Sequence, residues 1–172
     1  MLSTSVVYFT PTDKKFIITF YTMQNKFIDA VLKQAQKAYE KGEVPVGAII
    51  VKDNQIIARG YNQRINKNSG IYHAEIVAIE KACKKLNSWR LDDCEIWVSL
   101  EPCIMCAGAI MQTRIKKVYF LAQDTKGGAV ISKYTLFDDQ KLPFKVEYEY
   151  IPVKEASDIL KRFFKEKREI KK

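Results

Sequence analysis

A helical spacing of apolar residues becomes clear after about residue 25. Apolar side chains recur every four residues there, at Phe27, Val31, Ala35 and Tyr39. That spacing puts them on one side of an α-helix, so it predicts a helix with one buried face. Asn25 is a suitable N-cap for the start of this helix, and Gly42 is a suitable stop at its end.

Strand-like and helical stretches alternate along the rest of the chain. Two short apolar runs, 46–52 and 55–61, flank Asp53-Asn54, which predicts a β-hairpin. The later apolar patterns predict helices over 73–86, 103–112 and 154–168, and strands over 95–100, 117–123 and 145–151. This order predicts an α/β fold, a three-layer α/β/α sandwich in which helices cover both faces of a mixed five-stranded sheet.

The first 22 residues differ in pattern from the remainder. They contain two short β-prone pieces, 6–9 and 16–21, which Pro11 separates. We interpret residues 1–22 as an N-terminal extension, poorly ordered or accessory, that precedes a domain over residues 23–172. An added edge strand is the alternative.

Composition limits the class of protein. The chain has 172 residues, of which 47% are apolar, and this is enough for one domain with a substantial core. It has no apolar run long enough to span a membrane and no secretory signal pattern, so we expect a cytoplasmic protein whose four cysteines are reduced. The net charge of +9 favours a polyanionic partner, although a basic surface can also serve solubility alone.

Cys103 and Cys106 are the first candidates for chemistry. They lie three residues apart in EPCIMC, at the start of a predicted helix, so both sulfurs can point to one place. The free amides of a helix N-terminus also stabilise thiolates. The pair fits a redox couple, a closed structural zinc site or an open catalytic zinc site.

His73, the only histidine of the chain, favours the third of these. A closed zinc site needs four protein ligands. Cys83 lies among apolar residues of a helix and Cys94 at the start of a strand, so we interpret both as ordinary buried cysteines. His73, Cys103 and Cys106 would then bind one Zn²⁺ and leave one position for water.

Glu75 follows His73 by two residues at the same helix end. A carboxylate beside a zinc-activated water can accept its proton and return it to a leaving group. A non-catalytic zinc or RNA-binding module has no need for such a base. The pattern therefore favours an enzyme, with the binding module as the least favoured interpretation.

The sequences HAE and PCIMC match the H-x-E and P-C-x-x-C signature of zinc-dependent nucleobase deaminases. Over residues 24–170 the chain also resembles the bacterial tRNA-specific adenosine deaminases. The further matching stretches are VPVGAIIV (44–51), GYN (60–62), RIKKVYF (114–120), DTKGGA (124–129) and RFFKEKR (162–168). The resemblance implies a cytidine deaminase-like fold, a homodimer and one zinc ion per subunit, held by His73, Cys103 and Cys106.

The same resemblance implies a reaction, the hydrolytic deamination of adenosine to inosine at the wobble position of a tRNA anticodon, with Glu75 as the proton shuttle. A deaminase of a free base or nucleoside, of the guanine or cytosine type, remains the alternative because those enzymes share the zinc motifs. The residues that would contact the substrate are Val46 and Ala74 in the pocket wall, Asn62 on the flipped base, and Asp124, Lys126, Phe164 and Arg168 at the anticodon loop.

Two features bear on these RNA contacts. The phenylalanines of the last helix, Phe163 and Phe164, could pack on the sheet or stack on nucleotides, or divide these roles between them. Leu121 and Ile131 depart from the usual residues of the family, close in sequence to Asp124.

Overall fold

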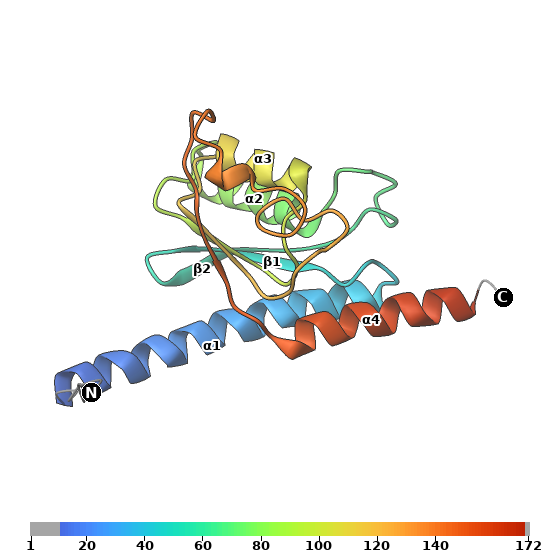
Figure 1. Cartoon of the computed structure of the whole chain (residues 1–172), viewed down its shortest axis with the longest axis horizontal. Coiled ribbons are helices and arrows are strands. Elements are labelled where there is room, and N and C mark those ends of the chain that lie inside the picture. Colours follow the sequence, from blue (N-terminus) through green and yellow to red (C-terminus); the bar gives the residue numbers. More distant parts are fainter. Residues whose placement is uncertain (1–10, 171–172) are drawn as a thin grey trace, which may run out of the picture.

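The computed structural model describes the backbone of residues 11–170 and the side-chain surroundings of residues 22–170. One five-stranded sheet lies between two pairs of helices, as the overall view shows (Figure 1). The predicted three-layer α/β/α architecture is therefore confirmed. Its elements are α1 (Pro11–Glu40), β1 (Gly47–Lys52), β2 (Gln55–Tyr61), α2 (Ala74–Leu86), β3 (Glu95–Val98), α3 (Ile104–Gln112), β4 (Lys117–Phe120), β5 (Glu147–Tyr150) and α4 (Lys154–Glu169), with a 3-10 turn, η1, at Leu136–Asp138.

The sheet is mixed, as predicted, with the strand order β2-β1-β3-β4-β5. β1 runs antiparallel to β2 and β3, whereas β3, β4 and β5 are parallel. The β1–β2 hairpin turns at Asp53 and Asn54, whose φ angles are +48° and +60°. Two consecutive left-handed residues match the twist of the flanking strands, and Asp and Asn tolerate that conformation best among residues with a side chain.

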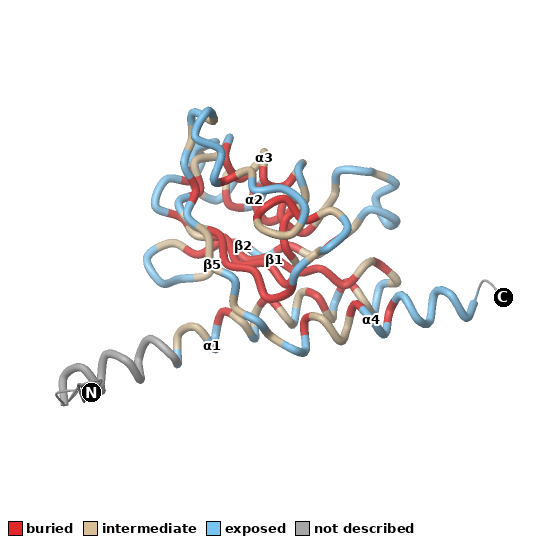
Figure 2. Tube along the Cα trace, in the orientation of Figure 1, coloured by how far each residue is buried: buried red, intermediate tan, exposed pale blue. Residues whose placement is uncertain are grey.

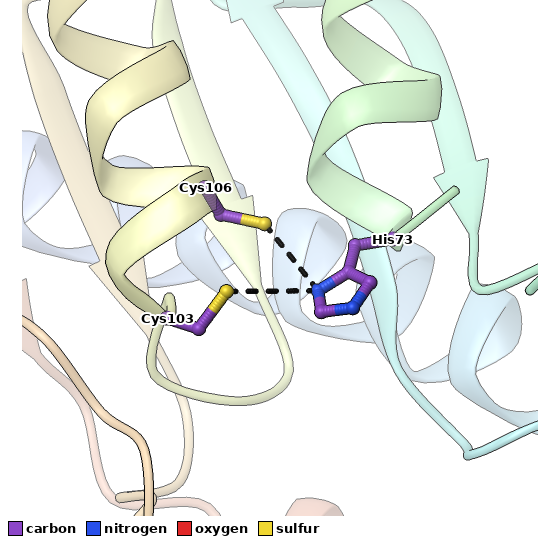
Figure 3. Close-up of side chains that lie close together, drawn as sticks. All are labelled: His73, Cys103 and Cys106. Atoms are coloured by element: carbon purple, nitrogen blue, oxygen red, sulfur yellow. Dashed lines mark hydrogen bonds between the residues drawn. The ribbon is translucent and has the colours of Figure 1, made fainter. Parts of the chain in front are cut away.

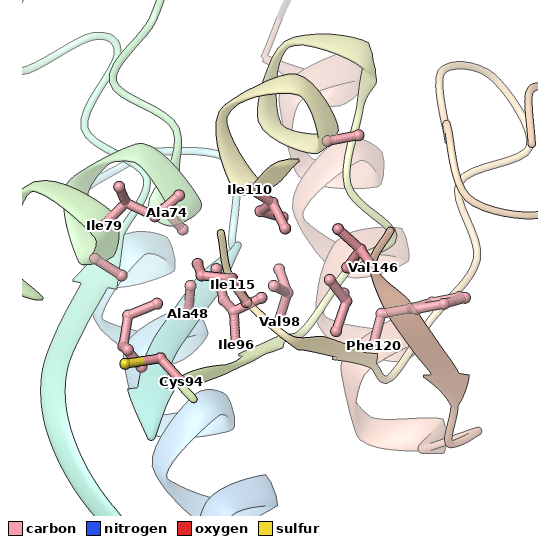
Figure 4. Close-up of a cluster of buried hydrophobic side chains, with 14 of the residues drawn as sticks. Ala48, Ala74, Ile79, Cys94, Ile96, Val98, Ile110, Ile115, Phe120 and Val146 are labelled. Carbon is pink, nitrogen blue, oxygen red and sulfur yellow. The ribbon is translucent and has the colours of Figure 1, made fainter. Parts of the chain in front are cut away.

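Alternate residues of the central strands serve two separate cores. Ile50 and Val98 belong to the core on the side of α2 and α3. Figure 4 shows Val98 in that cluster. Ile49 and Trp97 face the opposite way, toward α1. Buried segments accordingly run through the middle of the molecule on both sides of the sheet (Figure 2). Because both faces of β1 and β3 are covered, these strands are apolar at consecutive residues, 48–51 and 96–98, rather than at every second residue.

Glycine lets a helix approach the sheet closely at one point that matters for the site. A Cβ atom on Gly60 in β2 would lie 2.7 Å from the backbone nitrogen of Ala78 and would overlap the carbonyl oxygen of Ala74. The first turn of α2 can therefore rest directly on β2 only because residue 60 lacks a side chain. This contact places the N-terminus of α2, next to His73, against the sheet.

The start of α1 was predicted wrongly. The helix begins at Pro11, so Asn25 lies inside it, and residues 16–21 are helical rather than β-stranded. A helix that is anchored by Phe27 and Val31 gains one hydrogen bond for each residue added, and β propensity has no effect without a partner strand. Residues 6–9 lie outside the described residues, and the domain boundary at residue 23 stays a prediction.

Smaller differences concern the strands and the helices. β3, β4 and β5 are each shorter than predicted, whereas α2, α3 and α4 match their predicted ranges to within a residue. Although α1 is 30 residues long, neither it nor any other helix within residues 11–170 is apolar enough to cross a bilayer.

The last helix, α4, packs beside α1 on the face of the sheet opposite α2 and α3 (Figure 1). The hydroxyl of Tyr39, near the end of α1, donates a hydrogen bond to the Glu166 carboxylate at 2.7 Å. The Arg162 guanidinium lies 4.5 Å from the centre of the Tyr39 ring. These contacts fix the C-terminal half of α4 relative to the end of α1.

Candidate active site

An imidazole and two sulfurs meet where two helices begin. His73 is the N-cap residue of α2, Cys103 is the N-cap residue of α3, and Cys106 lies in the first turn of α3. His73 Nδ1 is 3.7 Å from Cys103 Sγ and 3.5 Å from Cys106 Sγ (Figure 3). Neither N-cap side chain forms a capping hydrogen bond, so both can bind a ligand between the two helices.

The protonation of the two cysteines fits a metal site. A hydrogen bond from the Cys106 thiol lowers the pKa of Cys103 to about 4, and His73 contributes to this shift. The pKa of Cys106 is raised, because its thiol donates to Cys103 and because it is buried. The bond to Cys103 also raises the pKa of His73. A metal ion takes the place of the shared protons when it binds such a set of donors.

These donors suit zinc. Zn²⁺ prefers sulfur and imidazole ligands, and a catalytic site provides three protein ligands with one position open. Among the described residues, no other His, Cys, Asp or Glu joins the three as a fourth ligand. Cys94 is buried in the core and Cys83 packs against it, as expected for ordinary cysteines. A redox pair would have no need of His73 beside both sulfurs, so the geometry favours an open zinc site.

Glu75 lies in the first turn of α2, with 3% of its surface exposed. Its Oε2 atom is buried and has no hydrogen-bond partner. An unsatisfied buried polar atom costs about 1–3 kcal/mol, and more when it is charged, so this carboxylate is suited to meet a bound ligand. Burial raises the pKa of Glu75 to about 7, so the group can both accept and donate a proton near neutrality.

A cavity of about 570 Å³ opens beside these residues. Its volume is in the range of small-ligand sites. His73, Glu75 and Cys103 line it, and so does every residue that the sequence assigned to substrate binding: Val46, Asn62, Ala74, Asp124, Lys126, Phe164 and Arg168. The structure therefore brings the whole predicted set to one place, and the role of each residue stays a prediction.

Asn62 has the second unpartnered oxygen in this cavity. It is 4% exposed, and its Oδ1 atom is buried without a hydrogen bond. The backbone nitrogen of Asn62 is held by the carbonyl oxygen of Val46 at 3.0 Å, next to the hairpin. An acceptor in this position can select a ligand that presents an N–H group.

The two phenylalanines of α4 divide their roles. Phe163 is 5% exposed and packs on Tyr39, with 6.1 Å between the ring centres. Phe164 is 45% exposed and lines the cavity. Neighbouring residues on a helix point about 100° apart, so one ring can pack while the next faces the cavity.

Several cavity residues were not among the predicted site residues. Arg64 and Lys161 both line the cavity, and neither was among the predicted site residues. Two buried carboxylates were also missed: Glu101, which lines the cavity, and Glu43, which does not. Glu43 accepts hydrogen bonds from the backbone nitrogens of Ile65 (3.1 Å) and Asn66 (2.7 Å), so it holds the loop that carries Arg64. In the sequence, Glu43 and Glu101 stand out only as charged residues that adjoin predicted apolar strands.

Comparisons with known proteins agree with this site. Residues 22–122 match the family model described as the cytidine and deoxycytidylate deaminase zinc-binding region. A tRNA-specific adenosine deaminase of Aquifex aeolicus is 46% identical over 142 residues, which is 83% of this chain and 94% of that protein.

Two solved structures are also similar. One comes from a study of A-to-I editing by tRNA:A34 deaminases at the wobble position of transfer RNA. Its TM-score is 0.76 at 39% sequence identity, and the match covers 79% of this chain and 99% of the solved chain. The other is guanine deaminase from Bacillus subtilis, with a TM-score of 0.56, 32% identity, and coverage of 82% and 93%. The fold is thus shared by enzymes that act on RNA and on a free base.

The metal assignment predicts different outcomes for two cysteine variants. Cys106→Ala removes a ligand, so the purified protein should lose most of the one zinc ion per subunit that we expect in the wild type. Cys83→Ala is the matched control, and it should keep its zinc, because Cys83 lies outside the cluster. Metal content measured by plasma mass spectrometry checks both. Full zinc in Cys106→Ala, or its loss in Cys83→Ala, would contradict the assignment.

Proposed function

Because the chain belongs to the zinc-dependent cytidine and deoxycytidylate deaminase family, and within it to the tRNA-specific adenosine deaminases, we propose that it converts adenosine to inosine at the wobble position of a tRNA anticodon. The observation that carries this proposal is the composition of one cavity. This cavity is lined by the zinc-binding residues His73 and Cys103 and by Glu75, whose Oε2 atom has no partner. An exposed aromatic ring and four cations line it as well. The cytoplasm, where tRNA is found, is the expected location.

The chemistry follows from these residues. Zinc, when bound, supplies a water that can lose a proton at neutral pH. Glu75 accepts that proton and donates it to the departing amino nitrogen of the base, because its pKa near 7 suits both steps. The oxygen of the water replaces the amino group at C6, and ammonia leaves. The Oδ1 atom of Asn62 can accept a hydrogen bond from the C6 amino group of the bound adenosine, the only N–H donor of that base.

The cavity walls favour RNA over a free base. Arg64, Lys126, Lys161 and Arg168 line the cavity from three separate segments of the chain. A free guanine or cytosine has no phosphate that these four cationic side chains could bind, whereas an anticodon loop has several. The exposed ring of Phe164 adds a surface on which an unstacked nucleotide can rest.

A homodimer is the expected assembly. The sequence of α3, IMCAGAIMQ, contains no charged residue. Ile104 in its first turn is 51% exposed, and Ile71, two residues before His73, is 57% exposed. Exposed apolar side chains on an uncharged helix are suited to burial against a second subunit. This surface lies next to the zinc ligands, so pairing through it would bring a second subunit close to the cavity.

The proposed reaction is tested with the wild-type protein and four substrates. An anticodon stem-loop with adenosine at the wobble position should be deaminated, and sequencing should show that adenosine as guanosine. Free guanine, cytosine and adenosine should release little ammonia in parallel. Turnover of a free base without turnover of the RNA would select the alternative enzyme class.

Glu75→Gln is the control for the catalytic step. It keeps the size of the side chain and removes the base, so the variant should retain zinc and lose about 10²- to 10⁴-fold in turnover of the stem-loop. Substantial remaining activity would refute the proton-shuttle role of Glu75.

Phe164→Ala and Phe163→Ala form a matched pair on α4. Loss of the exposed ring should raise the KM for the stem-loop about 5- to 150-fold, corresponding to ~1–3 kcal/mol for one stacked base, with little change in unfolding. Loss of the buried ring should instead lower the free energy of unfolding by about 3–5 kcal/mol. Steady-state kinetics and urea unfolding measure the two effects. If Phe164→Ala bound RNA normally, the stacking role would be wrong.

Ile104→Glu tests the dimer. A carboxylate buried at an apolar interface is costly, so the variant should be monomeric at concentrations where the wild type is dimeric. Light scattering after size-exclusion chromatography measures the mass. Lys116→Glu is the control, because Lys116 is exposed and lies beyond the C-terminal end of α3. A dimer that survives Ile104→Glu would exclude this surface as the interface.

A further inference from the structure

Glu101 is a buried carboxylate whose hydrogen bonds all serve one loop. It follows β3, precedes Pro102 and the zinc ligand Cys103, and is 2% exposed. Its Oε1 atom accepts hydrogen bonds from the backbone nitrogens of Val130 (3.0 Å), Ile131 (2.7 Å) and Ser132 (2.9 Å). Its Oε2 atom accepts from the backbone nitrogen of Asp124 (3.1 Å) and from the Ser132 hydroxyl. One side chain therefore binds both ends of the segment 124–132.

The same segment is also joined to the backbone beside Cys103. The nitrogen of Ala129 donates to the carbonyl oxygen of Pro102 at 2.8 Å, and Gly128 forms a β-bridge with Cys103. Gly128 has no room for a side chain, because a Cβ atom there would overlap the carboxyl group of Glu101. The loop thus has a fixed position relative to the segment that carries a zinc ligand.

Three residues of the loop line the cavity, Asp124, Thr125 and Lys126, and two of them are charged. Asp124 Oδ1 accepts a hydrogen bond from the backbone nitrogen of Lys126 at 3.0 Å, so the two residues are held together. Residues 124–132 contain no helix or strand that could fix them independently. Their position relative to the cavity therefore depends on what holds the two ends of the loop.

A carboxylate is well suited to this task. Three consecutive backbone N–H groups, at residues 130–132, point to one place, and a buried N–H group without a partner is costly. Only a side chain with two acceptor oxygens can serve these three donors and the Asp124 amide together. An apolar residue in this position would fill the space but leave the amides unsatisfied.

We propose that Glu101 is a positioning residue for the deamination: it holds the loop 124–132 so that Asp124 and Lys126 meet the nucleotide that flanks the reacting adenosine. This inference rests on the proposed function, because it assigns the loop to RNA. Glu101 also lines the cavity, but both oxygens of its carboxylate are bonded to the loop. Its effect passes through the loop, in particular through Lys126 and the phosphate that this lysine can bind.

Glu101→Gln is the informative variant. It keeps the volume of the side chain, but its amide NH₂ group must face one of the N–H donors that a carboxylate oxygen served, so the loop loosens. The variant should keep one zinc ion per subunit, and its kcat/KM for the anticodon stem-loop should fall about 10- to 100-fold, mainly through KM. Hydrogen exchange should accelerate at the amides of 124 and 130–132 and stay unchanged in α2 and α3.

A double-mutant cycle separates positioning from a general loss of stability. Each variant lowers kcat/KM for the stem-loop by some factor. If Glu101 acts through Lys126, the factor for the double variant Glu101→Gln/Lys126→Ala should be at least about threefold smaller than the product of the two single factors. Glu43→Gln is the matched control, because Glu43 is also fully buried but holds the loop at residues 65 and 66. The decreases in kcat/KM caused by Glu43→Gln and by Lys126→Ala should simply multiply in their double variant.

Ser132→Ala removes one of the five hydrogen bonds and keeps the carboxylate, so it tests the same claim if Glu101→Gln fails to fold. It should show a smaller loss of the same kind. Three results would each overturn the proposal. They are multiplicative decreases in kcat/KM in the Glu101 cycle, no effect of Lys126→Ala on kcat/KM, and unchanged hydrogen exchange at residues 130–132 in Glu101→Gln. A wild-type protein that does not deaminate the stem-loop would instead refute the proposed function, and the exchange experiment would still report whether Glu101 holds the loop.

Discussion

The site depends on the meeting of two helix N-termini. α2 and α3 each begin with a zinc-binding residue, His73 and Cys103, and the side chains of these two residues are not used to cap their own helices. The first turn of α3 adds Cys106, whose spacing from Cys103 puts both sulfurs on the same side. Helix N-termini also favour negative charge, so the location itself stabilises thiolates. Any change that separates these two helix starts removes the site.

The sheet keeps the two helix starts together. α2 and α3 lie side by side on one face of the sheet, and their apolar residues share a single core with β1 and β3 (Figure 4). The close contact at Gly60 sets the distance between α2 and β2, and the segment after β3 leads directly to Cys103. The opposite face carries α1 and α4, and α4 adds Lys161, Phe164 and Arg168 to the lining of the same cavity. The cavity beside the metal-binding residues is therefore lined by α2 on one face of the sheet, by α4 on the other, and by the loops between them.

The zinc site could be predicted from the sequence because metal chemistry restricts both residue type and spacing. His73, Glu75, Cys103 and Cys106 belong to two short motifs, and each motif is local. The roles of Glu43 and Glu101 could not be predicted in this way, because their partners lie more than 20 residues away and are mostly backbone amides. The division between Phe163 and Phe164 depends on how α4 rotates against Tyr39, which no local pattern specifies. The start of α1 was missed because the cooperative growth of a helix outweighed weak β propensity.

The central claim is that three protein atoms bind zinc and leave one position for solvent. X-ray absorption at the zinc edge on the purified protein measures this coordination directly. The account predicts two sulfurs at about 2.3 Å and two lighter atoms at about 2.0–2.1 Å, one of them from the single imidazole, with the same spectrum in Glu75→Gln. A third sulfur, or the loss of a light atom in Glu75→Gln, would show that the protein fills the fourth position, and would contradict the account.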